Sequence, residues 1–472
     1  MNVKSPLRIP LEPDMNADAK RSIEQDKAHH VHPQSNLRQH SENGPTMITH
    51  GKGVFIYDSE GREIIDGFSG LGCVSLGYHN ERLAGAAMRQ MNTLPFAPTF
   101  YNRSHPKVAE LGERLTAMAP NGMTRAMFQC SGSEANDTAI KLLWYTNTAK
   151  GEPNRRKVVG RVRGYHGNTI ATVSLSGQPH MHAKFGLPLP EFKHTELPNY
   201  YRFHIEGESE QEFSARMAAK LEELILSEGP ETIAAFFAEP AISGGGTLMP
   251  PEGYWEQMQA VLRKYDIKLL ADEVVCGFGR TGNMWGSETW GMKPDMVTCA
   301  KALSAAFFPV SALMFKDDMY ADMMKNSDEV GVFGHGYTYA GHPVGAAVSL
   351  EALDIYDEID LVGHVRMVSE KFLTKCHAMA DHPLVAEVRG VGLFCGFELM
   401  KDAKAREPFD PSWKVGELVQ NFAHDRGLYL RAIGDRMSFM PPLIISEDEI
   451  EIATERFKGA LDDAWTVVKA KL

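Results

Sequence analysis

The sequence predicts an α/β fold in which a large domain with a mainly parallel sheet carries a smaller α+β unit. The 472 residues are 43% hydrophobic and 23% charged, a balance typical of folded chains and unlike disordered or collagen-like ones. Short apolar runs alternate with amphipathic stretches from about residue 104 to 345, which indicates right-handed strand–helix–strand crossovers. Beyond residue 380 the pattern changes to short strands between helices.

Length and charge narrow the classes of function. A chain of this length suggests about two or three domains. The net charge of −12 repels phosphate backbones and anionic lipid, so we expect neither nucleic acid nor a membrane as partner. The apolar runs fall short of the roughly 18 residues that a membrane span needs. The six cysteines form no CxxC pair, which favours reduced thiols and a cytoplasmic location.

The N-terminal segment, residues 1–40, is polar, is predicted to be flexible and lacks the apolar core of a signal peptide. It contains His29, His30 and His32 just before Pro33. Two interpretations stay open, a metal-binding tract or a surface or interface segment kinked at the proline. Next, Gly53–Asp66 alternates, turns at Ser59-Glu60-Gly61 and returns, which predicts a hairpin.

The remaining elements follow in order. Strands are predicted at 125–130, 157–162, 232–238, 267–275, 295–300 and 311–315, and helices at 135–147, 215–229, 254–266 and 346–380. The smaller unit has strands within 385–399, a helix at 413–426, strands at 428–433 and 436–444, and a helix at 447–471. We therefore divide the chain into the flexible segment 1–40, an N-terminal part of the small domain at 41–95, the large domain at 96–345 and a C-terminal small domain at 346–472.

Polar residues follow several of the predicted strands, and in open parallel sheets ligands bind outside the carboxyl ends of strands. These residues are SGSEAN at 131–136, GYHGN at 164–168, Glu239, Asp272 and Lys301. One lysine, two carboxylates, an aromatic residue and a Gly/Ser turn at a helix start are the minimal set for a pyridoxal phosphate site.

Each part of this set has a simpler alternative. Ser131 and Glu134 have capping-box spacing, so the turn is either an anion site at a helix start or only a cap. Burial would lower the pKa of Lys301 as a Schiff-base lysine requires, but a lysine at a strand end can also reach water. Asp272 could hold a pyridinium nitrogen, or Asp272-Glu273 could be a solvated strand end or a metal-binding pair.

Eight stretches resemble the class III aminotransferases of pyridoxal phosphate fold type I. They are HGKGVFIYDSEGREIIDGFSGLG, QCSGSEANDTAIKLLWY, GRVRGYHGNT, FFAEPAISGGG, LLADEVVCGFGRTG, PDMVTCAKALSAAFFPVSALM, GHGYTYAGHPVGAA and RAIGDRMSFMPPLII. They occur in family order from about residue 27 onward, and FGLPLPEF with YWEQMQAVLRKYDI is most similar to the ω-amine:pyruvate subgroup. The resemblance implies a seven-stranded sheet in the large domain.

The resemblance also implies the cofactor-binding residues. Lys301 would form the Schiff base and move the proton, and Asp272 would hold the pyridine nitrogen. Tyr165 would stack on one ring face and Val274 on the other, with His166 and Gly167 completing the tyrosine turn. Gly132 and Ser133 would bind the phosphate, with Thr338 reaching it from the partner subunit of a homodimer, which could assemble further into a tetramer. Glu239 would lie near the cofactor hydroxyl.

For the substrate pocket, the resemblance implies that Arg431 swings in to pair with a carboxylate. Related enzymes often carry a bulky aromatic residue after the first hairpin, whereas this chain has Leu71 and Gly72 there. We therefore expect a wide pocket at Gly72, with Phe100 and Tyr101 as another wall.

The expected function is ping-pong transamination from a primary amine or ω-amino acid to pyruvate or another 2-oxo acid. An aminomutase or decarboxylating transaminase on the same fold is the first alternative. A nucleotide-binding oxidoreductase is remote, because we find no G-x-G-x-x-G after the first strand and no Walker A motif.

Overall fold

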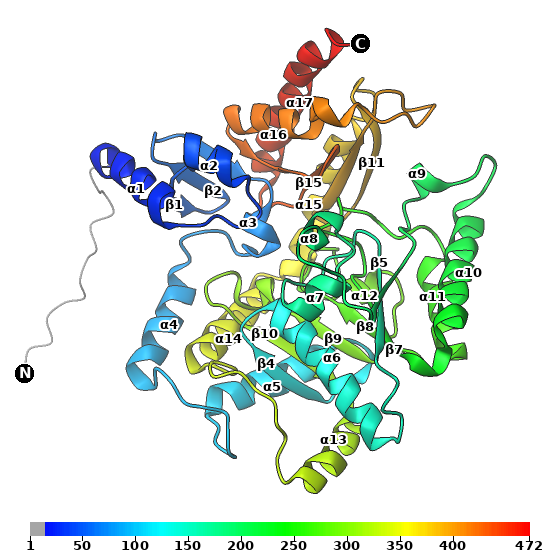
Figure 1. The fold of residues 1–472 in the computed structure, drawn as a ribbon. Coiled ribbons are helices and arrows are strands. Elements are labelled where there is room, and N and C mark those ends of the chain that lie inside the picture. The colour runs from blue at the N-terminus through cyan, green and yellow to red at the C-terminus, as the bar shows by residue number, and fades with distance from the viewer. Residues whose placement is uncertain (1–14) are drawn as a thin grey trace, which may run out of the picture.

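The computed structural model describes residues 15–472 and contains the predicted mainly parallel sheet of seven strands (Figure 1). Its order is β4-β10-β9-β8-β7-β5-β6, and β10 alone runs antiparallel to its neighbours β4 and β9. The strands are β4 Arg125–Gln129, β5 Lys157–Arg161, β6 Phe192–Thr195, β7 Ile233–Ala238, β8 Lys268–Asp272, β9 Met296–Cys299 and β10 Ser311–Phe315. All residues of β7, β9 and β10 are buried, as expected for strands covered on both faces.

Between residues 106 and 330, helices and turns alternate with the strands of this sheet. The helices are α5 Pro106–Met118, α6 Gly132–Ala149, α7 Ile170–Leu175, α8 Pro179–His182, α9 Tyr200–Phe203, α10 Glu210–Glu228, α11 Tyr254–Lys264, α12 Gly286–Thr289 and α13 Asp317–Val330, with 3-10 turns at Pro120–Gly122, Pro230–Thr232 and Lys301–Ser304. α6 packs on β10 and β9. Its residues Ala139 and Leu143 lie on one face of the helix and are buried in the apolar core that these strands share. No helix within residues 15–472 combines the length and the apolarity needed to cross a membrane.

A second sheet brings the two ends of the sequence together. It has the order β1-β2-β3-β13, where β1 is Ile48–Lys52, β2 Phe55–Asp58, β3 Glu63–Asp66 and β13 Leu428–Tyr429. β2 and β3 form the predicted hairpin, and the Asp58 carboxylate fixes its turn by accepting from the N–H groups of Glu60 and Arg62, both at 2.9 Å. β13 adds to β3 in parallel, so both terminal regions lie at the same end of the molecule (Figure 1).

The rest of this end comes mainly from the C-terminal third. A third sheet, β11-β12-β15-β14, consists of Val385–Val391, Phe394–Leu399, Arg436–Phe439 and Arg431–Ala432. The helices are α14 Pro343–Glu358, α15 Leu361–His377, α16 Val415–Asp425 and α17 Glu447–Lys469, with a 3-10 turn at Pro411–Trp413. Where one helical stretch was predicted at 346–380, Ile359 and Asp360 separate two helices, and Asp360 caps the second one with a φ of 45°.

Four helices precede α5: α1 Met15–His29, α2 Leu37–Asn43, α3 Ser69–Gly72 and α4 Glu81–Thr93. α1 and α2 thus occupy part of the segment predicted to be flexible, whose residues 1–14 lie outside the described part of the chain. α4 packs against α14 and pairs Arg82 with Glu351 at 2.8 Å. The domain boundaries at 40, 95 and 345 remain predictions.

Candidate active site

The centre of the site is the carboxylate of Asp272 at the end of β8, which is 3% exposed. Its Oδ2 accepts from the amide of Asn136 and from Nδ1 of His166, both at 2.8 Å. Because an ionised carboxylate only accepts, the shared proton belongs to Nδ1 of the imidazole. Oδ1 accepts from the N–H of Val274 at 3.2 Å and retains room for one more donor.

Asn136 and Thr298 belong to this network, although the sequence analysis gave neither of them a role of its own. Asn136 also donates to the carbonyl of His166 at 2.8 Å and accepts from the Thr298 hydroxyl at 2.8 Å. It thereby joins α6, the 164–168 turn, β8 and β9 at one buried point. The signal was present, because position 136 lies one helical turn after Ser133 and so on the same face as the predicted anion site.

The start of α6 lies beside this network. Ser131 is the N-cap, and its hydroxyl accepts from the N–H of Glu134 at 3.2 Å, as the cap interpretation predicted. The Glu134 carboxylate accepts from the N–H of Cys130 at 2.7 Å. A Cβ on Gly132 would lie 3.0 Å from Cγ2 of Val274, so only glycine leaves the first turn open against this valine. The N–H groups of a first helical turn have no partners within the helix and carry the positive end of its dipole.

The 164–168 turn packs against this helix start. The Ser133 hydroxyl accepts from the N–H of Asn168 at 3.1 Å. A Cβ on Gly167, whose φ is 132°, would lie 2.7 Å from Cα of Ser133. The glycine therefore allows the turn and the helix start to touch.

Glu239, at the end of β7, orients the tyrosine of that turn. Its Oε1 accepts from the N–H of Tyr165 at 3.0 Å, and its Oε2 accepts from the N–H and hydroxyl of Ser243 at 2.8 and 2.6 Å. The Tyr165 side chain is left partly exposed, with the residue 39% accessible, and partial burial raises the pKa of its phenol. Glu239 is thus a positioning residue for Tyr165 in this chain.

Lys301 follows β9 and faces the same space from the other side. Its φ of 50° is unusual for a residue with a side chain and is typical of strained functional positions. Burial lowers the pKa of its ammonium, with opposing influence from Cys73, Asp272 and Glu239. A lysine with a lowered pKa supplies more of the neutral amine, which is the nucleophilic form.

Gly72 lies directly opposite Lys301. A Cβ on Gly72 would lie 3.8 Å from Nζ of Lys301 and 3.5 Å from Cε of Met440. Its φ of 73° and the positive φ of Ser69 and Gly70 make α3 an irregular turn. The Asp66 carboxylate holds this turn by accepting from the N–H groups of Phe68 and Gly70, at 3.1 and 2.5 Å. Burial raises the pKa of Asp66.

The other predicted substrate residues are dispersed. Arg431 on β14 lies with its guanidinium 5.7 Å from the ring centroid of Phe68, and no carboxylate of residues 15–472 forms an ion pair with it. Its positive charge lies near enough to lower the pKa of both the Tyr165 phenol and the Lys301 ammonium. Leu71 is 57% exposed and lines a cavity of about 820 Å³ with His50, Asp66, Tyr78 and Tyr429 among others.

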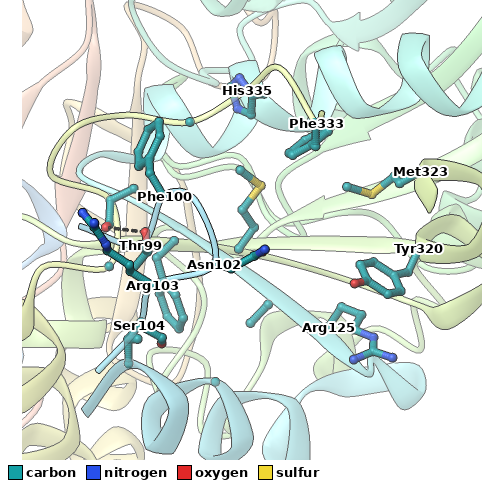
Figure 2. A pocket seen from close by; sticks show the side chains of 18 of the residues that line it. Thr99, Phe100, Asn102, Arg103, Ser104, Arg125, Tyr320, Met323, Phe333 and His335 are labelled. Carbon is teal, nitrogen blue, oxygen red and sulfur yellow. Dashed lines mark hydrogen bonds between the residues drawn. The ribbon is translucent and has the colours of Figure 1, made fainter. Parts of the chain in front are cut away.

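Phe100 and Tyr101 do not approach Lys301 within this chain. They line a different cavity of about 1100 Å³, in which residues 99–104 face Arg125, Tyr320 and Met323 (Figure 2). His335 and Gly336, from the segment that also carries Thr338, complete this cavity, and Thr338 is exposed. A substrate-binding role for Phe100 and Tyr101 therefore stays a prediction that requires a second subunit.

Taken together, the residues at the strand ends fit pyridoxal phosphate. The glycine-lined start of α6 suits a phosphate, the free lone pair of Asp272 suits a protonated ring nitrogen, and Val274 offers an apolar contact between them. Lys301 provides the amine for covalent attachment.

Comparisons with known proteins agree with this assignment. A model of the family described as aminotransferase class-III matches residues 37–461. γ-Aminobutyrate transaminase 1 (mitochondrial) of Oryza sativa subsp. indica is 44% identical over 88% of this chain and 81% of its own. Vanillin aminotransferase of Capsicum frutescens is 43% identical over 90% of this chain and 92% of its own length.

Solved structures show the same fold. The ω transaminase of Pseudomonas jessenii in complex with PMP has a TM-score of 0.94 and 44% identity, over 95% of this chain and 99% of its own. A thermostable ω transaminase in which one tryptophan is replaced by glycine, described as engineered for asymmetric synthesis of enantiopure bulky amines, has a TM-score of 0.94 and 45% identity, over 95% and 100%.

Proposed function

The chain belongs to the class III aminotransferases, and we propose that this pyridoxal phosphate-dependent enzyme transfers an amino group from a primary amine or ω-amino acid to pyruvate or another 2-oxo acid. The observation that carries the proposal is the placement of Lys301 opposite Gly72, beside the Asp272 network and within reach of the charge of an unpaired arginine, Arg431. A strand-end lysine serves the amine chemistry, and the arginine serves a carboxylate-bearing partner.

Pyridoxal phosphate supplies an aldehyde carbon for amines and a ring that withdraws electrons when its nitrogen is protonated. Asp272 would hold the ring nitrogen, while Asn136 and His166 fix the direction of its carboxylate. The N–H groups of Gly132 and Ser133 would hold the phosphate. Lys301 offers its neutral amine as nucleophile and then as the base that takes and returns the proton on the substrate carbon.

Substrate selection follows from the opposite wall. Arg431 binds the carboxylate of pyruvate and turns away for simple amines, because a guanidinium forms a bidentate pair or returns to solvent. Gly72 lacks the aromatic side chain that would narrow the pocket, so we propose that amines with groups larger than methyl are accepted. The tryptophan-to-glycine transaminase that was engineered for bulky amines supports this by analogy.

An amine-donor panel with pyruvate, read out as alanine formation, tests the proposal. We expect turnover of 1-aminopropane, β-alanine and a bulky aryl-alkyl amine, with alanine formed in equal amount to the ketone or aldehyde. Amino-group migration without any 2-oxo acid would instead identify an aminomutase, and carbon dioxide release would identify a decarboxylating transaminase.

We further propose a homodimer in which Thr338 binds the phosphate of the other subunit. Tyr101 and Val332, which line the cavity of about 1100 Å³, are 85% and 55% exposed. Tyr339, next to Thr338, is 62% exposed, and large exposed apolar surfaces usually mark interfaces. Thr338→Ala should weaken cofactor retention by about 1.5–3 kcal/mol, the value of a hydrogen bond to a charged group. Equilibrium dialysis of the cofactor and light scattering measure both parts. A monomer with full cofactor affinity in the variant contradicts the proposal.

A further inference from the structure

The histidine tract that the sequence analysis left open belongs to a compact cluster between α1 and α2. Within residues 15–472, one group of three histidine, cysteine or carboxylate side chains brings its ligand atoms within 4.8 Å of one another: Asp26, His32 and His40. Asp26 lies on α1, His40 on α2 and His32 in the turn between them. None of these residues belongs to the Asp272–Lys301 site.

The geometry of this cluster is convergent. Nε2 of His32 and Nε2 of His40 lie 2.8 and 3.3 Å from the same oxygen, Oδ1 of Asp26. All three atoms are shielded from solvent, and none makes a well-aligned hydrogen bond. The two imidazole rings stack with centroids 3.9 Å apart, so their nitrogens point to one place. Ligands of a tetrahedral Zn²⁺, with bonds of about 2.0–2.1 Å, are separated by about 3.3 Å.

The surroundings favour a cation as well. His30 contacts the other carboxylate oxygen of Asp26, with Nδ1 3.0 Å from Oδ2, which is the arrangement of an outer residue that orients a metal-binding carboxylate. The start of α2 is fixed separately by its N-cap Asn36, whose side chain accepts from the N–H groups of Arg38 and Gln39, both at 3.1 Å.

We propose that Asp26, His32 and His40 form a binding site for a divalent cation of the zinc class, with a water molecule as fourth ligand. Two imidazoles and one carboxylate are the donor set that borderline transition-metal ions prefer over Mg²⁺ or Ca²⁺. The bound ion joins α1 to α2 and holds the turn between them, whose Gln34 reaches His180 of α8 at 3.2 Å. The site is therefore structural and acts on the N-terminal segment.

Titration of chelator-treated holoenzyme with ZnCl₂ in a calorimeter tests this directly. We expect one site per chain that His40→Ala and His32→Ala abolish. His30→Ala should weaken it by about 10–100-fold, as expected for an outer partner. His29→Ala is the matched control, because His29 is the exposed neighbour on the same helix and should leave binding unchanged. Zn²⁺ that binds to the cofactor contributes the same background in every variant, so the differences between variants report on the cluster.

A second readout separates loss of a ligand from loss of the helix pair. Zn²⁺ should slow amide exchange in residues 26–43 of the wild type and of His29→Ala, but not of Asp26→Asn, which keeps the side-chain shape and removes the anionic ligand. If the amides of residues 26–43 already exchange faster in His40→Ala than in the wild type without metal, that substitution disturbs the helix pair. The comparison of Asp26→Asn with the wild type then tests metal binding. A wild type that binds no more Zn²⁺ than His40→Ala and Asp26→Asn overturns the proposal, as does an equal loss in His29→Ala.

Discussion

The two walls of the active site are built differently. The Asp272 wall consists of regular elements, the ends of β8 and β9 and the start of α6, joined by hydrogen bonds of Asn136 to three of its neighbours. The Gly72 wall is an irregular turn with successive positive φ angles, and its arginine has no carboxylate partner among the described residues. Under the proposed function, the common chemistry belongs to the first, rigid wall, and the choice of substrate belongs to the wall with fewer constraints.

Removing the nucleophile should break the function of the rigid wall completely. Lys301→Ala loses both covalent attachment and proton transfer, and proton transfer alone contributes about 10²–10⁴-fold. Alanine formation should fall to background, while the phosphate cradle still retains some cofactor. Absorbance spectra and stopped assays measure these two effects separately. Normal turnover would show that another group acts as the base.

Truncating the arginine should act on one substrate only. Arg431→Ala should reduce kcat/KM for pyruvate. The expected loss corresponds to about 2–5 kcal/mol of transition-state stabilisation, the cost of removing one side of a desolvated charge pair. The half-reaction with 1-aminopropane, which has no carboxylate, should change little. Arg431→Lys keeps the charge but not the bidentate geometry and should fall between. Equal losses in both half-reactions would indicate a structural role for Arg431.

Asn136 tests whether the rigid wall acts through position. Asn136→Ala leaves Asp272 with one side-chain donor fewer. We expect the activation free energy of proton transfer to rise by about 1–3 kcal/mol, the cost of a buried polar group that loses its partner. The matched control is Asn147→Ala. Asn147 lies on the same helix, α6, but away from the site, and its side chain donates to the carbonyl of Arg155 at 2.8 Å. Both should lower thermal stability, but only the first should lower kcat and shift its pH profile. Similar kcat values in the two variants would refute the positioning role.

The smallest expected effect concerns selectivity at Gly72. Gly72→Trp should depress turnover of bulky amines about 10-fold or more relative to 1-aminopropane, since even one misplaced methylene costs about 1–3 kcal/mol. Gly72→Ala is the control, because at a φ of 73° any side chain strains the turn. Alanine should therefore lower all donors alike. If tryptophan also lowers all donors alike, Gly72 serves backbone conformation and not pocket width.

The difference between the walls also explains what the sequence could predict. Apolar runs specify buried strands, and the rule that ligands bind at their carboxyl ends located Asp272, Glu239 and Lys301 without any contact information. Asn136 was missed because a polar residue inside a helix reads as a solvent-facing position until the strand behind it is known. The pocket role of Phe100 and Tyr101 stays a prediction, because the path of a loop depends on what packs against it, here the 331–341 segment.

The pairing of β13 with β3 has a consequence for the order in which the protein is made. Leu428 pairs with Ile65, and the N–H of Ile65 donates to the carbonyl of Gly427 at 2.8 Å. Until the ribosome has released residue 428, the hairpin that leads into the Gly72 turn lacks its outer neighbour, although β4 to β10 are already complete. The central sheet can therefore form during synthesis, while the sheet that leads into the Gly72 turn is completed afterwards. A nascent chain halted after α15 would possess the lysine and its carboxylate but no defined pocket.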